Sequence, residues 1–317
     1  MPILNADNYR PGFPFRNPHI NTIFPPVFRK IEQPSFVRER LNTVDDDFLD
    51  VDWLKKGHRR LAILCHGLEG SSDSQYIKGT ANLLHKREWD VLAMNYRSCS
   101  GEINLQYRMY HSGATDDLHF VVNEVEIAYE EIVLIGFSLG GNLVLKYSND
   151  GIYELSQKIK KTVAVSVPVD LGGAAVEIMK PKNKIYERRF LKSLGDKALA
   201  KSRQFPDRFP MDNYKKVKNL RDFDEYFTGP IHGFAGAEDY YTRCSALQFL
   251  NNVRFPTLIL NAQDDTFLSE SCYPRDLAKA NEFLFLSVPK YGGHVGFTIL
   301  GADHYWEELQ IAAFIER

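Results

Sequence analysis

The chain has 317 residues, of which 44% are hydrophobic, and its formal net charge is -2. This length and apolar content allow a large buried core and favour one enlarged α/β domain over several small ones. The near-neutral charge gives no general attraction to nucleic acid. No apolar run approaches the ~20 residues that cross a bilayer, and no secretion signal is recognised, so we expect a cytoplasmic protein.

The four cysteines are spread along the chain without CxxC or Cys/His spacing. They are Cys65, Cys99, Cys244 and Cys272. Zinc sites and disulfide frameworks need closely spaced or recurring ligand pairs. We therefore expect reduced, packed thiols, no disulfide framework and no metal site.

Short apolar runs predict a mostly parallel central sheet. After a lead-in of about residues 1–55, which holds a predicted hairpin, six runs have strand length and little alternation. Strands buried on both faces have this pattern, which implies helices on both faces of the sheet. The predicted strands are 61–65, 91–94, 132–135, 162–167, 257–260 and 283–286, and the predicted helices include 76–84, 117–125 and 305–315.

Residues from about 171 to 245 interrupt this rhythm and predict a helical cap inserted over the strand ends. Residues 180–208 carry ten Lys/Arg against three acids, and Tyr186, Phe190 and Leu194 recur at a spacing of four. One interpretation is a solvated basic helix face over core residues. The other is a cap that receives an anionic or membrane-associated substrate and contacts lipid peripherally.

The stretch from Gly136 to Gly140, with Ser138 at its centre, lies between a predicted strand and a helical pattern. Gly-x-Ser-x-Gly in this position is typical of a nucleophile elbow, in which a strained turn projects the serine hydroxyl above the sheet. The glycines leave room for the neighbouring strand and the start of the helix. Glycines around a serine also mark ordinary strand-to-helix turns, so the pattern alone is moderately specific.

A serine nucleophile needs a base, and the base needs an acid, in the chain order Ser, Asp/Glu, His. Asp264 and Asp265 come in the loop after the predicted strand 257–260. Asp264 lies 126 residues after Ser138. We favour Asp264, because the triad acid should lie just off the strand, and expect Asp265 to cap or face solvent. The choice between these neighbours stays open at this point.

His294 is the predicted base, because its loop follows the last strand, precedes the last helix and contains paired glycines. The amides of Leu68 and Leu139 are the predicted oxyanion donors, since Leu139 follows the nucleophile and Leu68 follows an earlier strand. His66 has no partners at metal-ligand spacing, so we interpret it as a residue that shapes this loop.

Motifs along nearly the whole chain resemble the YheT-like branch of the α/β-hydrolases, which is related to medium-chain acyl ester hydrolases and acyltransferases and to lung α/β-hydrolases. These motifs are Arg-Asn-Pro-His at 16–19, Asp-Asp-Phe-Leu-Asp at 46–50, His-Gly-Leu-Glu-Gly-Ser-Ser at 66–72, residues 95–102 and 110–113, the elbow, residues 186–190 and 239–241, and Gly-Gly-His-Val-Gly-Phe at 292–297.

The resemblance implies that the serine, acid and histidine of the family fall on Ser138, Asp264 and His294. Thr266 stands where the family often has proline, which leaves the choice of acid slightly open. The implied function is hydrolysis of a small-molecule carboxylic ester with a short to medium acyl chain, without a cofactor. Acyl transfer to alcohols is the alternative enzyme function, and a non-catalytic binding protein of the same fold is the alternative from another class.

Overall fold

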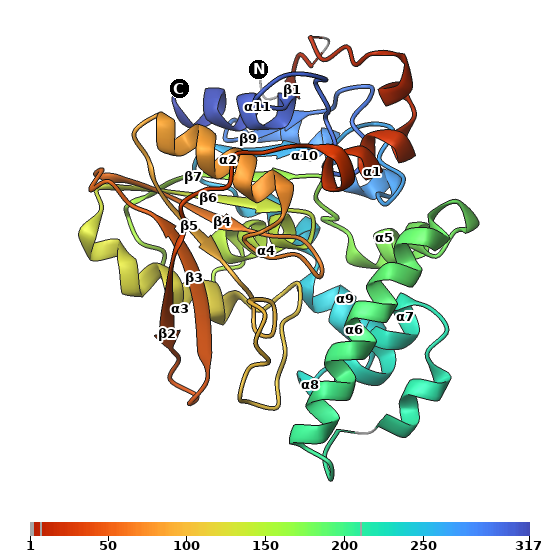
Figure 1. Cartoon of the computed structure of the whole chain (residues 1–317). Coiled ribbons are helices and arrows are strands. Elements are labelled where there is room, and N and C mark those ends of the chain that lie inside the picture. The colour runs from red at the N-terminus through yellow and green to blue at the C-terminus, as the bar shows by residue number, and fades with distance from the viewer. Residues whose placement is uncertain (1–2, 7, 210) are drawn as a thin grey trace.

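The computed structural model describes residues 3–6, 8–209 and 211–317. Within them, nine strands form one sheet in the order β1-β9-β8-β7-β6-β4-β5-β3-β2 (Figure 1). The β2–β3 and β3–β5 pairs are antiparallel and the other pairs are parallel. The strands are β1 (Ile3–Leu4), β2 (Val37–Asn42), β3 (Phe48–Leu54), β4 (Arg60–Cys65), β5 (Asp90–Met94), β6 (Glu131–Phe137), β7 (Ile159–Val165), β8 (Thr257–Leu260) and β9 (Leu284–Ser287).

Helices cover both faces of this sheet. The helices of the body are α1 (Pro18–Phe28), α2 (Gln75–Lys86), α3 (Thr115–Val125), α4 (Leu139–Asn149), α10 (Arg275–Ala280) and α11 (Trp306–Ile315). Alternate residues of β4 point to opposite sides, as a pleated strand requires. Leu64 packs in a core with α2 and α11, whereas Ile63 packs in a core with α3 and α4.

The fold class predicted from the sequence is confirmed: a mostly parallel sheet lies between two helical layers. The six apolar runs correspond to β4 through β9, and the lead-in hairpin corresponds to β2 and β3. The central strands carry continuous apolar sequence because both of their faces are buried. All four cysteines are buried and free of disulfides, as expected.

The N-terminal segment contains two elements that the sequence analysis missed. β1 pairs with β9 at one edge of the sheet, and α1 begins directly after Asn17. The Asn17 side chain accepts hydrogen bonds from the amides of His19 and Ile20, with Pro18 at the first helical position. Asparagine followed by proline is a helix-start signal, but Pro25 and Pro26 within the helix obscure it.

Between β7 and β8 the chain forms a group of helices beside the ends of the strands, coloured green to cyan in Figure 1. They are α5 (Leu171–Ile178), α6 (Lys184–Gln204), α7 (Leu220–Phe223), α8 (Gly229–Ile231) and α9 (Ala237–Cys244), and we refer to residues 171–245 as the cap. The cap has an apolar cluster of its own that includes Leu194, Phe223 and Phe227. In the described parts of the chain, no helix combines the length and the apolar character needed to cross a membrane.

A polar contact ties the cap to the body. Glu69, in the loop after β4, accepts hydrogen bonds from Lys197 Nζ at 2.9 Å and from the Ser193 hydroxyl, both on α6. Glu69 also accepts a hydrogen bond from Tyr110 Oη at 2.6 Å. Because the Glu69 side chain is only 5% exposed, these contacts fix the cap helix against the loop that precedes α2.

Candidate active site

Ser138 lies in a sharp turn between β6 and α4. Its backbone has φ 51° and ψ -118°, a strained conformation for a residue with a side chain. A Cβ atom on Gly136 would lie 2.1 Å from the Gly140 carbonyl oxygen, and one on Gly140 would lie 2.3 Å from the Cys65 carbonyl oxygen. Glycine is therefore required at both positions, because the backbone at Gly136 lies against the start of α4 and the backbone at Gly140 lies against the end of β4.

His294 lies in the loop after β9 and faces Ser138. Its Nε2 is 2.9 Å from Ser138 Oγ. The His294 amide donates to Thr22 Oγ1 at 2.9 Å, and the Phe267 ring stacks on the imidazole with centroids 4.2 Å apart. The turn after β6, helix α1 and the loop after β8 thus converge on His294, so the position of this residue is set by contacts from three separate parts of the chain.

The acid that contacts the imidazole is Asp265. Its Oδ2 lies 2.8 Å from His294 Nδ1, and its Oδ1 accepts the Phe267 amide at 2.9 Å. The prediction that Asp264 is the acid next to His294 is wrong, because the structure places Asp265 against the imidazole. Both aspartates lie in the turns that follow β8, where the chain directs Asp265 to the imidazole and Asp264 to the Gly293 amide.

Asp264 instead supports the loop that carries His294. Its Oδ1 accepts the Gly293 amide at 2.9 Å, while its Oδ2 has no hydrogen-bond partner among the described residues. Burial raises the pKa of Asp264 to about 6, and the nearby Asp265 adds to the rise. The two aspartates thus have different environments: one touches the imidazole and the other touches the backbone next to it.

The loop from His66 to Gly70 lies beside Ser138. A Cβ atom on Gly67 would be 3.2 Å from Ser138 Cβ. His66 is fully buried, with Nδ1 2.7 Å from the Gly67 carbonyl and Nε2 accepting the Tyr96 amide. Burial lowers the pKa of His66 to about 3, so this histidine is neutral and shapes the loop, as expected.

Leu68 and Leu139, the predicted oxyanion donors, line the same cavity as Ser138 and His294. The amides on either side of Leu68 are already bonded: Gly67 donates to Tyr76 Oη and Glu69 donates to Tyr110 Oη. These tyrosines hold the backbone of the loop on both sides of Leu68.

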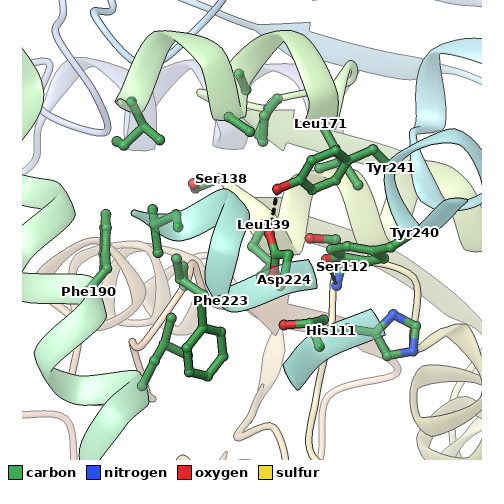
Figure 2. A pocket seen from close by; sticks show the side chains of 18 of the residues that line it. His111, Ser112, Ser138, Leu139, Leu171, Phe190, Phe223, Asp224, Tyr240 and Tyr241 are labelled. Atoms are coloured by element: carbon green, nitrogen blue, oxygen red, sulfur yellow. Dashed lines mark hydrogen bonds between the residues drawn. The ribbon is translucent and has the colours of Figure 1, made fainter. Parts of the chain in front are cut away.

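A cavity of about 150 Å³ opens at Ser138, and most of its lining is apolar. Phe190 and Leu194 of α6 line it, and Tyr186, one turn earlier, packs edge-on against Phe267 with centroids 4.8 Å apart. In Figure 2, Phe190 and Phe223 lie on the side of the cavity opposite Tyr240 and Tyr241. The apolar stripe noted in the sequence therefore contributes both to the cap core and to the wall of the site.

No role at this site was predicted from the sequence for several residues that the structure places there. Thr22 and Phe267 contact His294, and His19 Nδ1 lies 3.0 Å from Tyr186 Oη, which joins α1 to the cap. Asp224 and Tyr241 of the cap line the cavity. Thr22, Phe267 and Asp224 lie outside the motifs quoted above, whereas His19 and Tyr241 lie within two of them, at 16–19 and 239–241. The contacts of all five residues arise from long-range packing.

Comparison with known proteins agrees with the observed fold. Residues 62–298 match the family described as the alpha/beta hydrolase fold. The chain is 34% identical to YheT of Escherichia coli, covering 89% of this chain and 85% of that protein. It is 28% identical to mouse phospholipase ABHD3 over 87% of this chain and 70% of that protein. It is also 28% identical to yeast monoacylglycerol lipase, over 86% and 61%.

Among solved structures, the Pyrococcus furiosus esterase Pf2001 has the same fold. Its TM-score is 0.59 at 16% sequence identity, over 92% of this chain and 96% of that one. At this identity the likeness concerns the fold alone.

Proposed function

The chain belongs to the α/β-hydrolase fold family and has esterase- and lipase-like relatives, and from that premise we propose that it is a serine hydrolase of carboxylic esters with short to medium acyl chains. Ser138 is the nucleophile, His294 the general base and acid, and Asp265 the residue that orients the imidazole. The amides of Leu68 and Leu139 bind the oxyanion.

The observation that carries this proposal is a pair of hydrogen bonds: one joins His294 Nδ1 to Asp265 at 2.8 Å, and the other joins Ser138 Oγ to His294 Nε2 at 2.9 Å. A proton on Nδ1, donated to Asp265, leaves Nε2 free to accept the Ser138 proton. The N-terminal end of α4 adds a partial positive charge close to the nucleophile, where negative charge develops.

The reaction follows from these positions. Ser138 Oγ attacks the ester carbonyl carbon while His294 Nε2 takes the hydroxyl proton, and the carbonyl oxygen becomes an oxyanion held by backbone amides. His294 then gives the proton to the departing alcohol oxygen, which leaves an acyl group on Ser138. Water, deprotonated by the same imidazole, attacks the acyl-enzyme and releases the acid.

The apolar lining beside Ser138 supports an aliphatic acyl chain. Phe190, Leu194 and Ile178 line the cavity, and apolar walls bind aliphatic chains by removing them from water. Hydrolysis of p-nitrophenyl esters of graded acyl length tests the proposal: activity at short to medium lengths is expected in the wild type and absent in Ser138→Ala. Equal rates for both proteins would reject it.

Two alternatives need separate measurements. An acyltransferase would resolve the same acyl-enzyme with an alcohol, so product analysis in the presence of ethanol would show ethyl ester in place of free acid. A non-catalytic binding protein would give no turnover with any ester. The bonded Ser138–His294 pair favours an enzyme, because a protein that only binds has no use for an activated hydroxyl.

We further propose that the basic cap contacts lipid surfaces peripherally. Arg188, Arg189 and Lys192 are exposed on α6, and apolar Ile185 beside them is 65% exposed. Basic side chains attract anionic headgroups and an exposed apolar side chain can enter the interface. This contact would bring the cap, whose residues line the cavity, close to membrane-borne esters.

A further inference from the structure

A carboxylate lies within the mostly apolar cavity at Ser138. Asp224 begins the helical turn Asp224–Thr228 of the cap and lines the cavity together with the catalytic side chains. No lysine or arginine is among the residues that line it in the described parts of the chain. Placing an acid in such a lining costs desolvation energy, and here no ionic partner offsets that cost. An acid is therefore an unusual feature of a site that binds a purely aliphatic chain.

Tyr241 holds this carboxylate in place. Its hydroxyl, on α9, donates to Asp224 Oδ2 at 2.6 Å, and Figure 2 shows the ring directed at Asp224 beside Leu139. The Thr228 side chain also hydrogen-bonds to Asp224. A carboxylate has about four acceptor positions, so these two bonds leave Asp224 able to accept others. The pair joins two elements of the cap and presents an oriented acceptor near the nucleophile.

Two other polar side chains of the lining, His232 and Tyr240, are bonded to backbone. His232 Nδ1 lies 2.8 Å from the Thr228 carbonyl, and its Nε2 contacts the backbone of Met109. Tyr240 Oη accepts the Ser112 amide at 3.0 Å. Asp224 is thus the lining acid with acceptor capacity to offer a substrate.

A donor on the substrate is needed to match this acceptor. An anionic group would be repelled, and a cation would lose more hydration on entering an apolar cavity than a neutral hydroxyl does. On the basis of the proposed ester hydrolysis, we infer that Asp224, held by Tyr241, binds a hydroxyl group of the substrate, so that the preferred esters carry a hydroxyl near the scissile bond.

The hydroxyl could belong to the alcohol part or to the acyl chain, and two matched pairs of substrates separate these sources. 1-Monooctanoylglycerol and propyl octanoate share the acyl chain and the three-carbon alcohol, and differ in two hydroxyls. Ethyl 3-hydroxyoctanoate and ethyl octanoate differ in one hydroxyl on the acyl side. The quantity measured is the ratio of kcat/KM within each pair.

The wild type should prefer the hydroxylated ester in one of the two pairs. That pair identifies whether the bound hydroxyl belongs to the alcohol part or to the acyl chain. Asp224→Asn keeps the shape and removes the charge, and it should reduce the preference about tenfold, because hydrogen bonds to charged groups are the stronger ones. Tyr241→Phe should reduce it as well, by loosening the carboxylate. Ile178→Val, a change in the same lining without a polar group, should leave the ratio as it is.

Labelling of Ser138 by a fluorophosphonate, measured on each variant, separates two failures. Preference ratios that stay at the wild-type value in labelled Asp224→Asn and Tyr241→Phe would overturn this inference and leave the proposed hydrolase intact. A wild type that prefers neither hydroxylated ester would overturn it too. A wild type without labelling would overturn the hydrolase and this inference together.

Discussion

Asp265 Oδ2 and His294 Nδ1 lie 2.8 Å apart across the ends of two adjacent strands, β8 and β9, and their side chains are 0% and 10% exposed. The neighbouring Asp264 is bonded to the backbone of Gly293 instead. Two aspartates that are adjacent in sequence therefore hold the same loop in different ways, one through the imidazole and the other through the main chain.

This difference predicts unequal effects on turnover. Asp265→Asn should lower kcat about 10⁴-fold, because an amide at this position no longer fixes the tautomer that accepts the serine proton. Asp264→Asn should lower it less than about tenfold, since an asparagine oxygen can still accept the Gly293 amide. Steady-state kinetics on an activated ester, with circular dichroism to verify folding, compares the two. A larger loss in folded Asp264→Asn would contradict this assignment.

Asp264 should also make stability depend on pH. Its pKa is raised by burial from 3.8 to about 6 in the folded protein. Because the pKa of this carboxyl is higher in the folded than in the unfolded protein, its contribution to the free energy of unfolding is fully present below pH ~3.8. That contribution is lost as the pH rises through about 6. The Tm of Asp264→Asn minus that of the wild type should therefore increase between pH 4 and pH 7. A difference that is flat over this range would show that Asp264 does not titrate as described.

Truncation in the cap wall should change acyl-chain preference. Phe190 lines the cavity, so Phe190→Ala should favour longer acyl chains, with about 1–3 kcal/mol of discrimination for each methylene accepted or refused. Ile185→Ala, on the same helix but 65% exposed, is the matched control and should keep the wild-type profile. kcat/KM across p-nitrophenyl esters of increasing length is the measurement. An unchanged profile in folded Phe190→Ala would assign this ring to internal packing.

Charge reversal on α6 should weaken lipid binding. Arg188→Glu with Arg189→Glu should reduce cosedimentation with vesicles containing anionic lipid, because each basic residue near such a surface contributes about 1 kcal/mol. Lys55→Glu with Lys56→Glu makes the same change in charge at exposed positions outside the cap. Equal binding of both double variants would argue against a lipid-facing cap.

The sequence was sufficient to predict the central strands and the pairing of Ser138 with His294. Strands such as β4 and β6 are apolar along their whole length because helices bury both faces, and this pattern is local. The elbow at Ser138 is local too, since its glycines are required by backbone within a few residues or on the next strand.

The features that could not be predicted from the sequence depend on the direction in which a side chain points and on contacts between distant parts of the chain. Asp264 and Asp265 have the same side chain and differ only in which way the chain turns after β8. Thr22 reaches His294 across 272 residues of sequence, and the Asp224–Tyr241 pair forms only when two cap elements pack together. Such contacts have no sequence period or motif that would reveal them.

The most direct test of the central claim is intact-mass analysis after treatment with a fluorophosphonate. Only a serine activated by a neighbouring base reacts rapidly with this reagent. The wild type should gain the mass of one adduct, which peptide mapping places on Ser138, and Ser138→Ala should gain none. An unmodified wild type, or an adduct of equal yield on Ser138→Ala, would contradict the assignment of Ser138 as the nucleophile.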